Sequence, residues 1–200
     1  MSPNKRWVYI TIPIEEGEQY AIGEVSIDGD IIFPEDELLD LIQVKPGEPW
    51  RRSRIMADQQ ALTDRYADDG YAFVNVVPLP ATDPDRKVAD IRFVIQKGNL
   101  VTLDRIRITG NDKTWDKVIR REIGIDEGEL WRGSELARAR YRLQRLGYFE
   151  DVNITTPRGE EPDTLDMVID VTEQPTGTFS VGAGISSVER FIFTANISRA

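Results

Sequence analysis

The sequence contains no cysteine and no histidine. Without cysteine the chain has no disulfide and no thiol nucleophile, and without histidine it lacks a common general base and a common zinc ligand. Nearly all zinc sites are excluded by the same two absences. The paired carboxylates Asp68–Asp69 and Glu160–Glu161 have no second convergent group beside them. We therefore predict that the chain is not an enzyme and needs no cofactor or metal.

Long apolar runs are also missing. No stretch of about 18 apolar residues occurs, which excludes a transmembrane helix, and Met1–Pro3 lacks the apolar segment of a signal peptide. If the chain works outside the cytoplasm, we expect it to be part of a longer precursor. Its formal net charge of -10 is the opposite of what a nucleic-acid surface requires.

The sequence does contain an internal repeat. The segment Val44–Trp50 returns 81 residues later as Ile125–Trp131, and both copies contain Gly-Glu-x-Trp. The same offset relates other apolar and glycine positions, namely Val25, Ile27 and Gly29 to Ile106, Ile108 and Gly110. A constant register over about 30 residues indicates two copies of one unit. We place these units at residues 18–98 and 99–175.

Each unit predicts the element order β-α-α-β-β. Strands are indicated by alternation of apolar and polar residues, and helices by apolar residues at helical spacing. In the first unit we expect a strand over 20–28, helices over 34–43 and from Ser53 to Gly70, and strands over 72–79 and 88–96. In the second we expect a strand over 101–109, helices over 114–123 and from Ser134 to Gly147, and strands over 150–156 and 165–172.

The two ends of the chain differ from the units. Residues 8–17 alternate in the same way as the last strand of each unit, so we interpret residues 1–17 as the last strand of an earlier copy. In residues 176–200, small or polar side chains alternate with apolar ones and charges are few. That pattern is typical of strands in a membrane β-barrel, so we interpret this segment as the truncated start of one.

Several of these features together resemble a known family. They are the glycine after each first strand, the Gly-Glu-x-Trp loop, Asn111–Glu122, Leu146–Phe149 and Thr178–Gly184. The chain resembles the POTRA domains and first barrel strands of the BamA family of outer-membrane β-barrel assembly proteins. The resemblance implies an α+β fold of tandem POTRA domains, each a three-stranded mixed sheet covered by two helices. It places the last strand of each unit at the centre of the sheet and the second strand at an edge.

The resemblance also implies a location and a function. Residues 18–98 would be the penultimate POTRA domain and 99–175 the membrane-proximal one, in the periplasmic part of a Gram-negative outer-membrane protein. Such domains bind unfolded outer-membrane proteins, and an open sheet edge can do so by β-strand addition. The candidate edge residues are Phe73, Val74, Asn75, Val76, Val77, Asp151, Val152, Asn153, Ile154 and Thr155. We expect Pro78 to limit the first edge and Thr155 to leave the second more open.

A second site follows from the resemblance alone. Members of the family scaffold assembly lipoproteins, and the positions that match the docking surface for a BamD-like lipoprotein are Arg120, Arg121 and Glu127. We expect charge reversal at Glu127 to weaken that docking.

Other interpretations stay open. Trp50 and Trp131 are better explained as plugs over their own cores than as partner anchors, and the arginines of the helix after Ser134 as a solvated face. Among functions, a TamA-like or two-partner secretion transporter would use similar domains to guide one exported substrate. A plain structural spacer would bind nothing at its edges.

Overall fold

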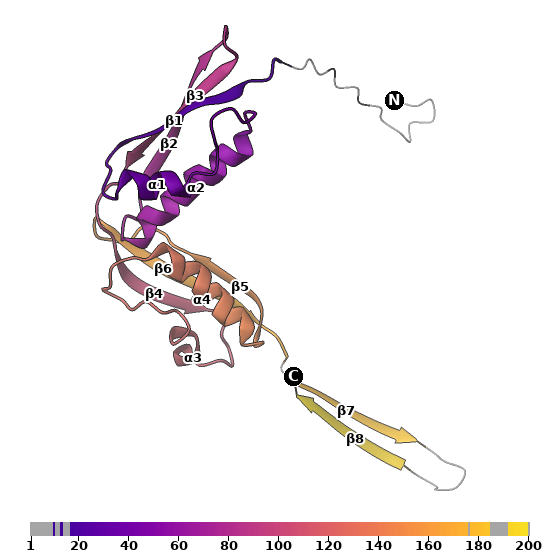
Figure 1. The fold of residues 1–200 in the computed structure, drawn as a ribbon. Helices are drawn as coiled ribbons and strands as arrows, with labels where there is room; N and C mark the ends of the chain where they lie inside the picture. The colour runs from indigo at the N-terminus through magenta and orange to yellow at the C-terminus, as the bar shows by residue number, and fades with distance from the viewer. Residues whose placement is uncertain (1–9, 11–12, 14–16, 176, 185–191, 200) are drawn as a thin grey trace.

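The computed structural model describes residues 10, 13, 17–175, 177–184 and 192–199. Two three-stranded sheets lie one after the other along the chain, each with helices packed on one face, and a two-stranded hairpin follows (Figure 1). The strand expected over residues 8–17 falls largely outside the described residues. The α+β architecture predicted from the sequence is confirmed.

The first unit contains β1 (Ala21–Gly29), α1 (Glu35–Leu41), α2 (Arg52–Asp68), β2 (Asn75–Asp83) and β3 (Val88–Gln96). Its sheet has the order β1-β3-β2, with β1 parallel and β2 antiparallel to the central β3. Alternate residues of β3 point beneath the helices and are buried, as the strand period of two requires. The core under the helices consists of Ile22, Ile27, Leu38, Ile42, Val44, Ile55, Leu62, Tyr66, Val76, Ile91, Phe93 and Ile95.

The second unit repeats this plan with β4 (Thr102–Thr109), α3 (Asp116–Arg120), α4 (Gly133–Arg145), β5 (Phe149–Thr155) and β6 (Thr164–Glu173). The sheet order is β4-β6-β5, so the last strand is again central and the second strand again lies at an edge. The core includes Val101, Leu103, Ile119, Ile123, Trp131, Leu143, Phe149, Val152, Ile154, Met167 and Ile169. This topology is the one that the resemblance implied.

Four elements differ from the sequence-based expectation. Strand β2 continues to Asp83, although a loop was expected from Pro80 onward. Helix α3 ends at Arg120 rather than near Ile123, because Arg142 donates hydrogen bonds to the carbonyl oxygens of Glu122 (2.6 Å) and Ile123 (2.7 Å) and holds them in a turn. Helices α2 and α4 begin at Arg52 and Gly133, one residue before the serines expected to start them, and the side chains of their N-cap residues, Arg51 and Arg132, make no capping hydrogen bond.

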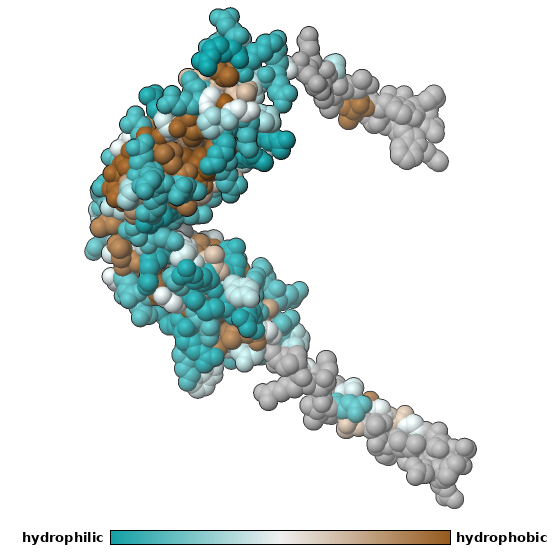
Figure 2. Space-filling model, in the orientation of Figure 1, coloured by the Kyte–Doolittle hydropathy of each residue, from teal (hydrophilic) through white to brown (hydrophobic). Residues whose placement is uncertain are grey.

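The last described residues form an antiparallel hairpin of β7 (Gly177–Gly184) and β8 (Ile192–Arg199). Figure 1 shows this hairpin projecting away from both three-stranded sheets. In Figure 2 the surface of the two units is mostly hydrophilic, with hydrophobic patches on the first unit and near the junction between the units.

A glycine ends the first strand of each unit because the central strand passes very close to it. Gly29 and Gly110 have positive φ angles of 96° and 81°, and a Cβ atom at either position would collide with a backbone carbonyl oxygen, that of Ile95 or Val171. Gly128 has a similar φ of 87°, yet a Cβ atom there would meet no atom within 4 Å. The repeated glycine after the strand is therefore required twice over, by its φ angle and by the space available.

We predict that Gly110→Ala lowers the free energy of unfolding by about 3 kcal/mol, because the φ strain and the backbone collision add. The matched variant Gly128→Ala carries the φ strain alone and should lose only about 1 kcal/mol. Urea denaturation followed by circular dichroism measures both. Equal losses for the two variants would show that the close approach to Val171 contributes nothing.

Candidate functional site

A three-stranded sheet has two outer edges, and in both units the outer edge of the first strand is covered. The covering segment of the first unit is the repeated Gly-Glu-x-Trp loop. The backbone carbonyl of Glu48 accepts a hydrogen bond from the N–H of Ile22 (2.7 Å), and the Gly47 N–H donates to the Ile22 carbonyl (2.8 Å). The N–H of Trp50 donates to the carbonyl of Tyr20 (2.8 Å). The loop thus acts as a short additional strand along β1.

The second unit covers β4 with the same bonds. The N–H of Leu103 donates to the backbone carbonyl of Glu129 (2.9 Å), and the N–H of Gly128 donates to the carbonyl of Leu103 (2.7 Å). The N–H of Trp131 donates to the carbonyl of Val101 (2.8 Å). The Trp131 side chain is only 4% exposed and belongs to the core. The repeated tryptophan therefore anchors the covering loop to its own unit, which agrees with the structural interpretation of its role.

In the second unit the pairing of β4 with β6 is irregular between Leu103 and Ile106. Beyond this irregularity, the side chains of Arg120 and Glu127 continue the cover of β4. Glu127 accepts a hydrogen bond from the N–H of Ile106 (2.8 Å), and Arg120 donates to the carbonyl of Ile106 (2.9 Å). The two side chains also form an ion pair at 3.2 Å. The N–H of Ile106, followed by Arg120, holds the pKa of Glu127 below its ordinary value.

The three residues predicted to dock a lipoprotein therefore differ in availability. Arg120 and Glu127 are each about half-exposed but spend hydrogen bonds on the β4 backbone. The side chain of Arg121 is 63% exposed and pairs only with Glu122, at 3.2 Å, among the described residues. In the first unit the positions that correspond to Arg120 and Glu127 are Leu39 and Pro46, so this arrangement belongs to the second unit alone.

The opposite edges, formed by β2 and β5, pair with no further strand in the described part of the chain. The orientation of their backbone groups follows from the central strand. The N–H of Asp30, just beyond β1, donates to the carbonyl of Ile95 (2.9 Å), so Ile95 directs its backbone groups toward β1. Its partner in β2 is Val76, which must therefore direct its own groups outward. By alternation, the outward residues of β2 are Val76, Pro78, Pro80 and Thr82.

The outer edge of β2 offers little to a pairing strand. Pro78 and Pro80 have no N–H, so two of the four outward positions cannot donate a hydrogen bond. The carbonyl of Val76 already accepts a hydrogen bond from the Gln59 side chain (2.7 Å). These same prolines fit within a strand because their nitrogens face away from β3, which explains why β2 continues beyond the expected loop.

The outer edge of β5 is open. Val152 pairs with Val171 and Ile154 with Ile169, in the register that Val76 and Pro78 have in the first unit. Ile154 thus stands where the first unit has a proline, and both Val152 and Ile154 direct an N–H outward. Their side chains are buried in the core, so this backbone is held in place. Among the described residues one side chain engages this edge: Arg140 donates a hydrogen bond to the carbonyl of Ile154 (3.4 Å).

Not every predicted edge residue lies on an edge strand. Asn75, Val76 and Val77 belong to β2, and Asp151, Val152, Asn153, Ile154 and Thr155 belong to β5. Phe73 and Val74 precede β2 and are not edge residues. Phe73 instead packs against the core of the second unit, with the guanidinium of Arg158 centred 4.3 Å above its ring. The alternation of apolar residues around Phe73 did not distinguish a strand from a contact between units.

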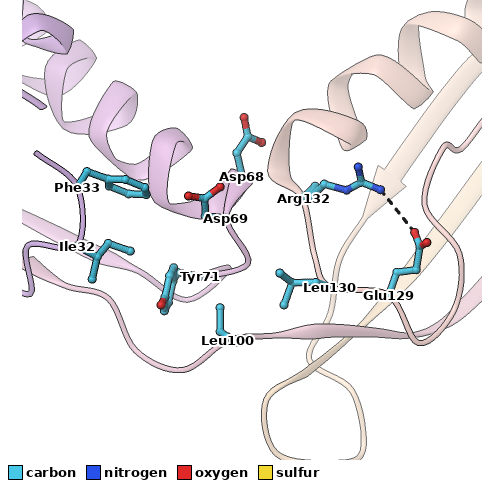
Figure 3. Close-up of a pocket in the computed structure, with 9 residues that line it drawn as sticks. All are labelled: Ile32, Phe33, Asp68, Asp69, Tyr71, Leu100, Glu129, Leu130 and Arg132. Atoms are coloured by element: carbon cyan, nitrogen blue, oxygen red, sulfur yellow. Dashed lines mark ion pairs between the residues drawn. The ribbon is translucent and has the colours of Figure 1, made fainter. Parts of the chain in front are cut away.

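The junction between the units holds a cavity that the sequence did not indicate. It has a volume of about 740 Å³, and Figure 3 shows the residues around it, which come from both units. They are Ile32, Phe33, Asp68, Asp69, Tyr71, Leu100, Glu129, Leu130 and Arg132. The cavity is a shallow groove between the end of α2 and the loop before α4.

Direct hydrogen bonds join the units beside this groove. The carboxylate of Asp68, at the end of α2, accepts a hydrogen bond from the N–H of Ser134 (2.5 Å) in the first turn of α4. One unit thus caps a helix of the next, because the first N–H groups of a helix lack partners within it. The N–H of Val101 also donates to the carbonyl of Gly70 (2.8 Å). The short connection at Gly98–Asn99 is therefore braced from both sides.

Comparison with known proteins agrees with the repeat. The POTRA family model, described as "Surface antigen variable number repeat", matches residues 20–98 and 101–174. The chain belongs to the POTRA family. BamA outer-membrane protein assembly factors are similar to it. That of Nitratidesulfovibrio vulgaris is 30% identical over 92% of this chain and 24% of its own length. That of Neisseria meningitidis serogroup B is 32% identical over 95% of this chain and 24% of its own length.

Solved structures of BamA are similar as well. The POTRA3-5 fragment of Haemophilus influenzae BamA has a TM-score of 0.71 and 26% identity, covering 77% of this chain and 61% of that one. Haemophilus ducreyi BamA lacking POTRA domains 1-3 has a TM-score of 0.70 and 28% identity, and the match covers 90% of this chain and 34% of that one. The resemblance to BamA is thereby confirmed, and with it the periplasmic location expected for POTRA domains. The chain spans about a quarter of the length of the curated relatives named above.

Neither a membrane-spanning helix nor a metal-binding cluster occurs in the part of the chain that the structure describes. None of the helices in the described ranges combines the length and apolar character needed to cross a membrane. No group of three or more acidic side chains within those ranges is arranged to hold a metal ion. The features that remain as a candidate site are the open backbone edge of β5 and the braced junction.

We predict that Asp68→Ala lowers the free energy of unfolding by about 1 kcal/mol, the typical contribution of a helix cap, and loosens the orientation of the two POTRA units. Its neighbour Asp69 forms an exposed pair with Arg65 at 3.1 Å, so Asp69→Ala should change stability by less than about 0.5 kcal/mol. Urea denaturation measures stability, and residual dipolar couplings measure the orientation. A fixed orientation in Asp68→Ala would contradict a role for this bond at the junction.

Proposed function

We propose that the two POTRA units are the periplasmic part of an outer-membrane protein assembly factor and bind unfolded outer-membrane proteins by β-strand addition at β5. The observation that carries this proposal is the pair of outward-directed N–H groups of Val152 and Ile154, which have no partner among the described residues. The similarity to BamA assembly factors supports the biological setting. In that setting residues 18–98 are the penultimate POTRA domain, 99–175 the membrane-proximal one, and 176–200 the first strands of a barrel.

Backbone pairing suits this class of client. Unfolded outer-membrane proteins share alternating strands but no common sequence motif, and main-chain hydrogen bonds make few demands on side chains. The exposed residues of β5 are Glu150, Asp151, Asn153 and Thr155, so the strand does not present an apolar surface that would attract any hydrophobic chain. Specificity for extended segments would then come from the backbone.

The structure also distinguishes the two edges of the POTRA pair. At β2 two prolines lack an N–H, whereas at β5 the outward N–H groups of Val152 and Ile154 have no partner among the described residues. Each edge has one outward carbonyl that accepts a side-chain hydrogen bond, from Gln59 at β2 and from Arg140 at β5. We therefore assign client binding to the second unit. If the units were only a structural spacer, neither edge would bind a peptide. A transporter that guides one exported substrate would be expected to recognise the side chains of that substrate as well as its backbone.

We predict that a synthetic peptide with the sequence of Gly177–Gly184, used as a barrel-strand probe, shifts the backbone amide signals of β5 and leaves those of β2 unchanged. The expected affinity is weak, so the NMR titration should reach millimolar peptide. A control peptide with proline at alternate positions cannot pair and should cause no shift. Shifts centred on β2, or none at all, would contradict the proposal.

The variant Pro78→Val/Pro80→Val tests the reason for the difference between the edges. It restores two outward N–H groups on β2, and both prolines are at least partly exposed, so the fold should tolerate the change. We expect the probe peptide to shift β2 amides in this variant as well as β5 amides. If β2 remains silent, the prolines are not what closes that edge.

We also propose that a BamD-like lipoprotein docks beside α3 through Arg121, with Arg120 and Glu127 shaping the surface. The exposure of Arg121 supports this, since its guanidinium is engaged only by Glu122 among the described residues. A glutamate carboxylate is charged at neutral pH, and the N–H of Ile106 holds the pKa of Glu127 lower still. Charge reversal at Glu127 would disturb both the docking surface and the cover of β4, so Arg121 gives the cleaner test.

We predict that Arg121→Glu weakens binding of a purified BamD-like lipoprotein by about tenfold, roughly 1.4 kcal/mol, without changing stability. Glu127→Gln, which keeps an acceptor for the N–H of Ile106, should weaken binding less than Glu127→Lys. Isothermal titration calorimetry at neutral pH measures all three. Unchanged affinity in Arg121→Glu and Glu127→Lys would remove this surface from the account.

A further inference from the structure

Two aromatic rings stand in the solvent at the end of the second unit where the chain leaves for β7. Trp115, at the N-terminus of α3, is 69% exposed, and Tyr148, just before β5, is 40% exposed. With Val118 they line a hollow of about 330 Å³, together with Lys113, Thr114, Glu173 and Gln174. We call this set the Trp115 surface. Exposed apolar side chains that gather in one patch, as these do around the hollow, mark a surface that binds a partner or a membrane.

The backbone segments that carry the two rings are held by residues at the end of β6 and just after it. The carboxylate of Glu173 accepts hydrogen bonds from the N–H groups of Lys113 (3.1 Å) and Thr114 (2.6 Å). The N–H of Gln174 donates to the carbonyl of Tyr148 (2.9 Å), and the Gln174 side chain donates to Gly147 (2.8 Å). The loop before α3 and the turn before β5 are thus both fastened to the exit point of the chain.

The exit point is also close to β7. Three residue steps separate Gln174 from Gly177, the first residue of β7, and an extended chain covers at most roughly 10 Å in three steps. In the proposed function β7 begins the membrane-embedded part of the protein. The Trp115 surface would then lie at the height of the bilayer surface, where the amphipathic rings of tryptophan and tyrosine are favoured.

Charges around the surface indicate the type of lipid contact. Lys117 lies over the ring of Trp115, with its Nζ 4.5 Å from the ring centre, and Lys113 lines the hollow. These two cations are offset by Asp112 and Asp116 on the same segment, as well as by Glu173. The surface therefore has no excess of positive charge, so attraction to anionic headgroups would not bring it to a membrane. A membrane contact at this surface would depend on insertion of the aromatic rings.

We propose that Trp115 and Tyr148 insert into the headgroup region of a phospholipid bilayer and fix the second unit against the membrane. The contact is made by the aromatic rings, so it is independent of lipid charge. This inference rests on the proposed membrane attachment of the segment after Pro175. It is separate from peptide binding at β5, which is measured in solution without lipid, so either can fail alone.

The test uses the full chain with a histidine tag after Ala200, tethered to nickel-chelating vesicles of phosphatidylcholine. The chain has no histidine of its own, so the tag is the only tether. Phosphatidylcholine brominated on its acyl chains near the headgroup quenches tryptophans that enter the bilayer. Because Trp115 is one of four tryptophans, we expect a loss of about one quarter of the emission, and no such loss in Trp115→Ala. Adding phosphatidylglycerol should not increase the loss.

Met56→Trp is the matched control. Met56 is 45% exposed on α2 of the first unit, so the variant adds an exposed tryptophan away from the Trp115 surface, and that tryptophan should not be quenched. Equal quenching in the wild type and Trp115→Ala would overturn the proposal, as would no quenching in either. In the second case a protein partner, rather than lipid, would have to cover these rings.

Discussion

The structure depends on how the backbone hydrogen-bonding groups at the edges of a three-stranded sheet are satisfied. A buried N–H or C=O without a hydrogen-bond partner is costly, and an exposed edge whose groups are unpaired pairs with any strand that reaches it. Each unit has two such edges and covers one of them with its own Gly-Glu-x-Trp loop. The most recognisable motif of the sequence is therefore an edge cover, and the tryptophan fixes that cover to the core.

The two units have diverged in how they complete the cover and in what they leave open. The second unit extends its cover with hydrogen bonds from Glu127 and Arg120 to the backbone of Ile106, whereas the first unit has Leu39 and Pro46 at the corresponding positions. On the opposite side, Pro78 closes a position that Ile154 leaves open. The same repeat thus supplies one unit with a blunted edge and the other with an available one. The junction, where Asp68 caps α4, holds both in one extended body.

Much of this could be predicted from the sequence because it depends on local periodicity. The element order and the two units follow from alternation and from the repeated glycines, which indicate a turn after the first strand. The central position of the last strand was implied by the family resemblance. The limits of β2 and α3 could not be predicted. Prolines normally end a strand, and only the outward direction of their nitrogens allows β2 to continue. The turn after α3 is held by Arg142, which lies far away in the sequence.

The candidate site was predictable in part for the same reason. The edge position of the second strand was implied by the family resemblance, and the alternation of residues located that strand, so most of the proposed edge residues lie on β2 or β5. The role of Phe73 depends on the junction, and that of Glu127 on a bond to the backbone of Ile106. Neither role produces a periodic pattern in the sequence. Contacts between units and between side chain and backbone are fixed by tertiary structure, which the pattern of one segment does not contain.

The most direct test of the account is amide hydrogen exchange of the isolated chain, measured residue by residue by NMR. If one edge is covered and the other open, the amides of Leu103 and Ile106 exchange slowly. Those of Val152 and Ile154 then exchange much faster than the amides of Asp151 and Asn153, which face β6. Slow exchange at Val152 and Ile154, or fast exchange at Leu103 and Ile106, would contradict the assignment of the open edge.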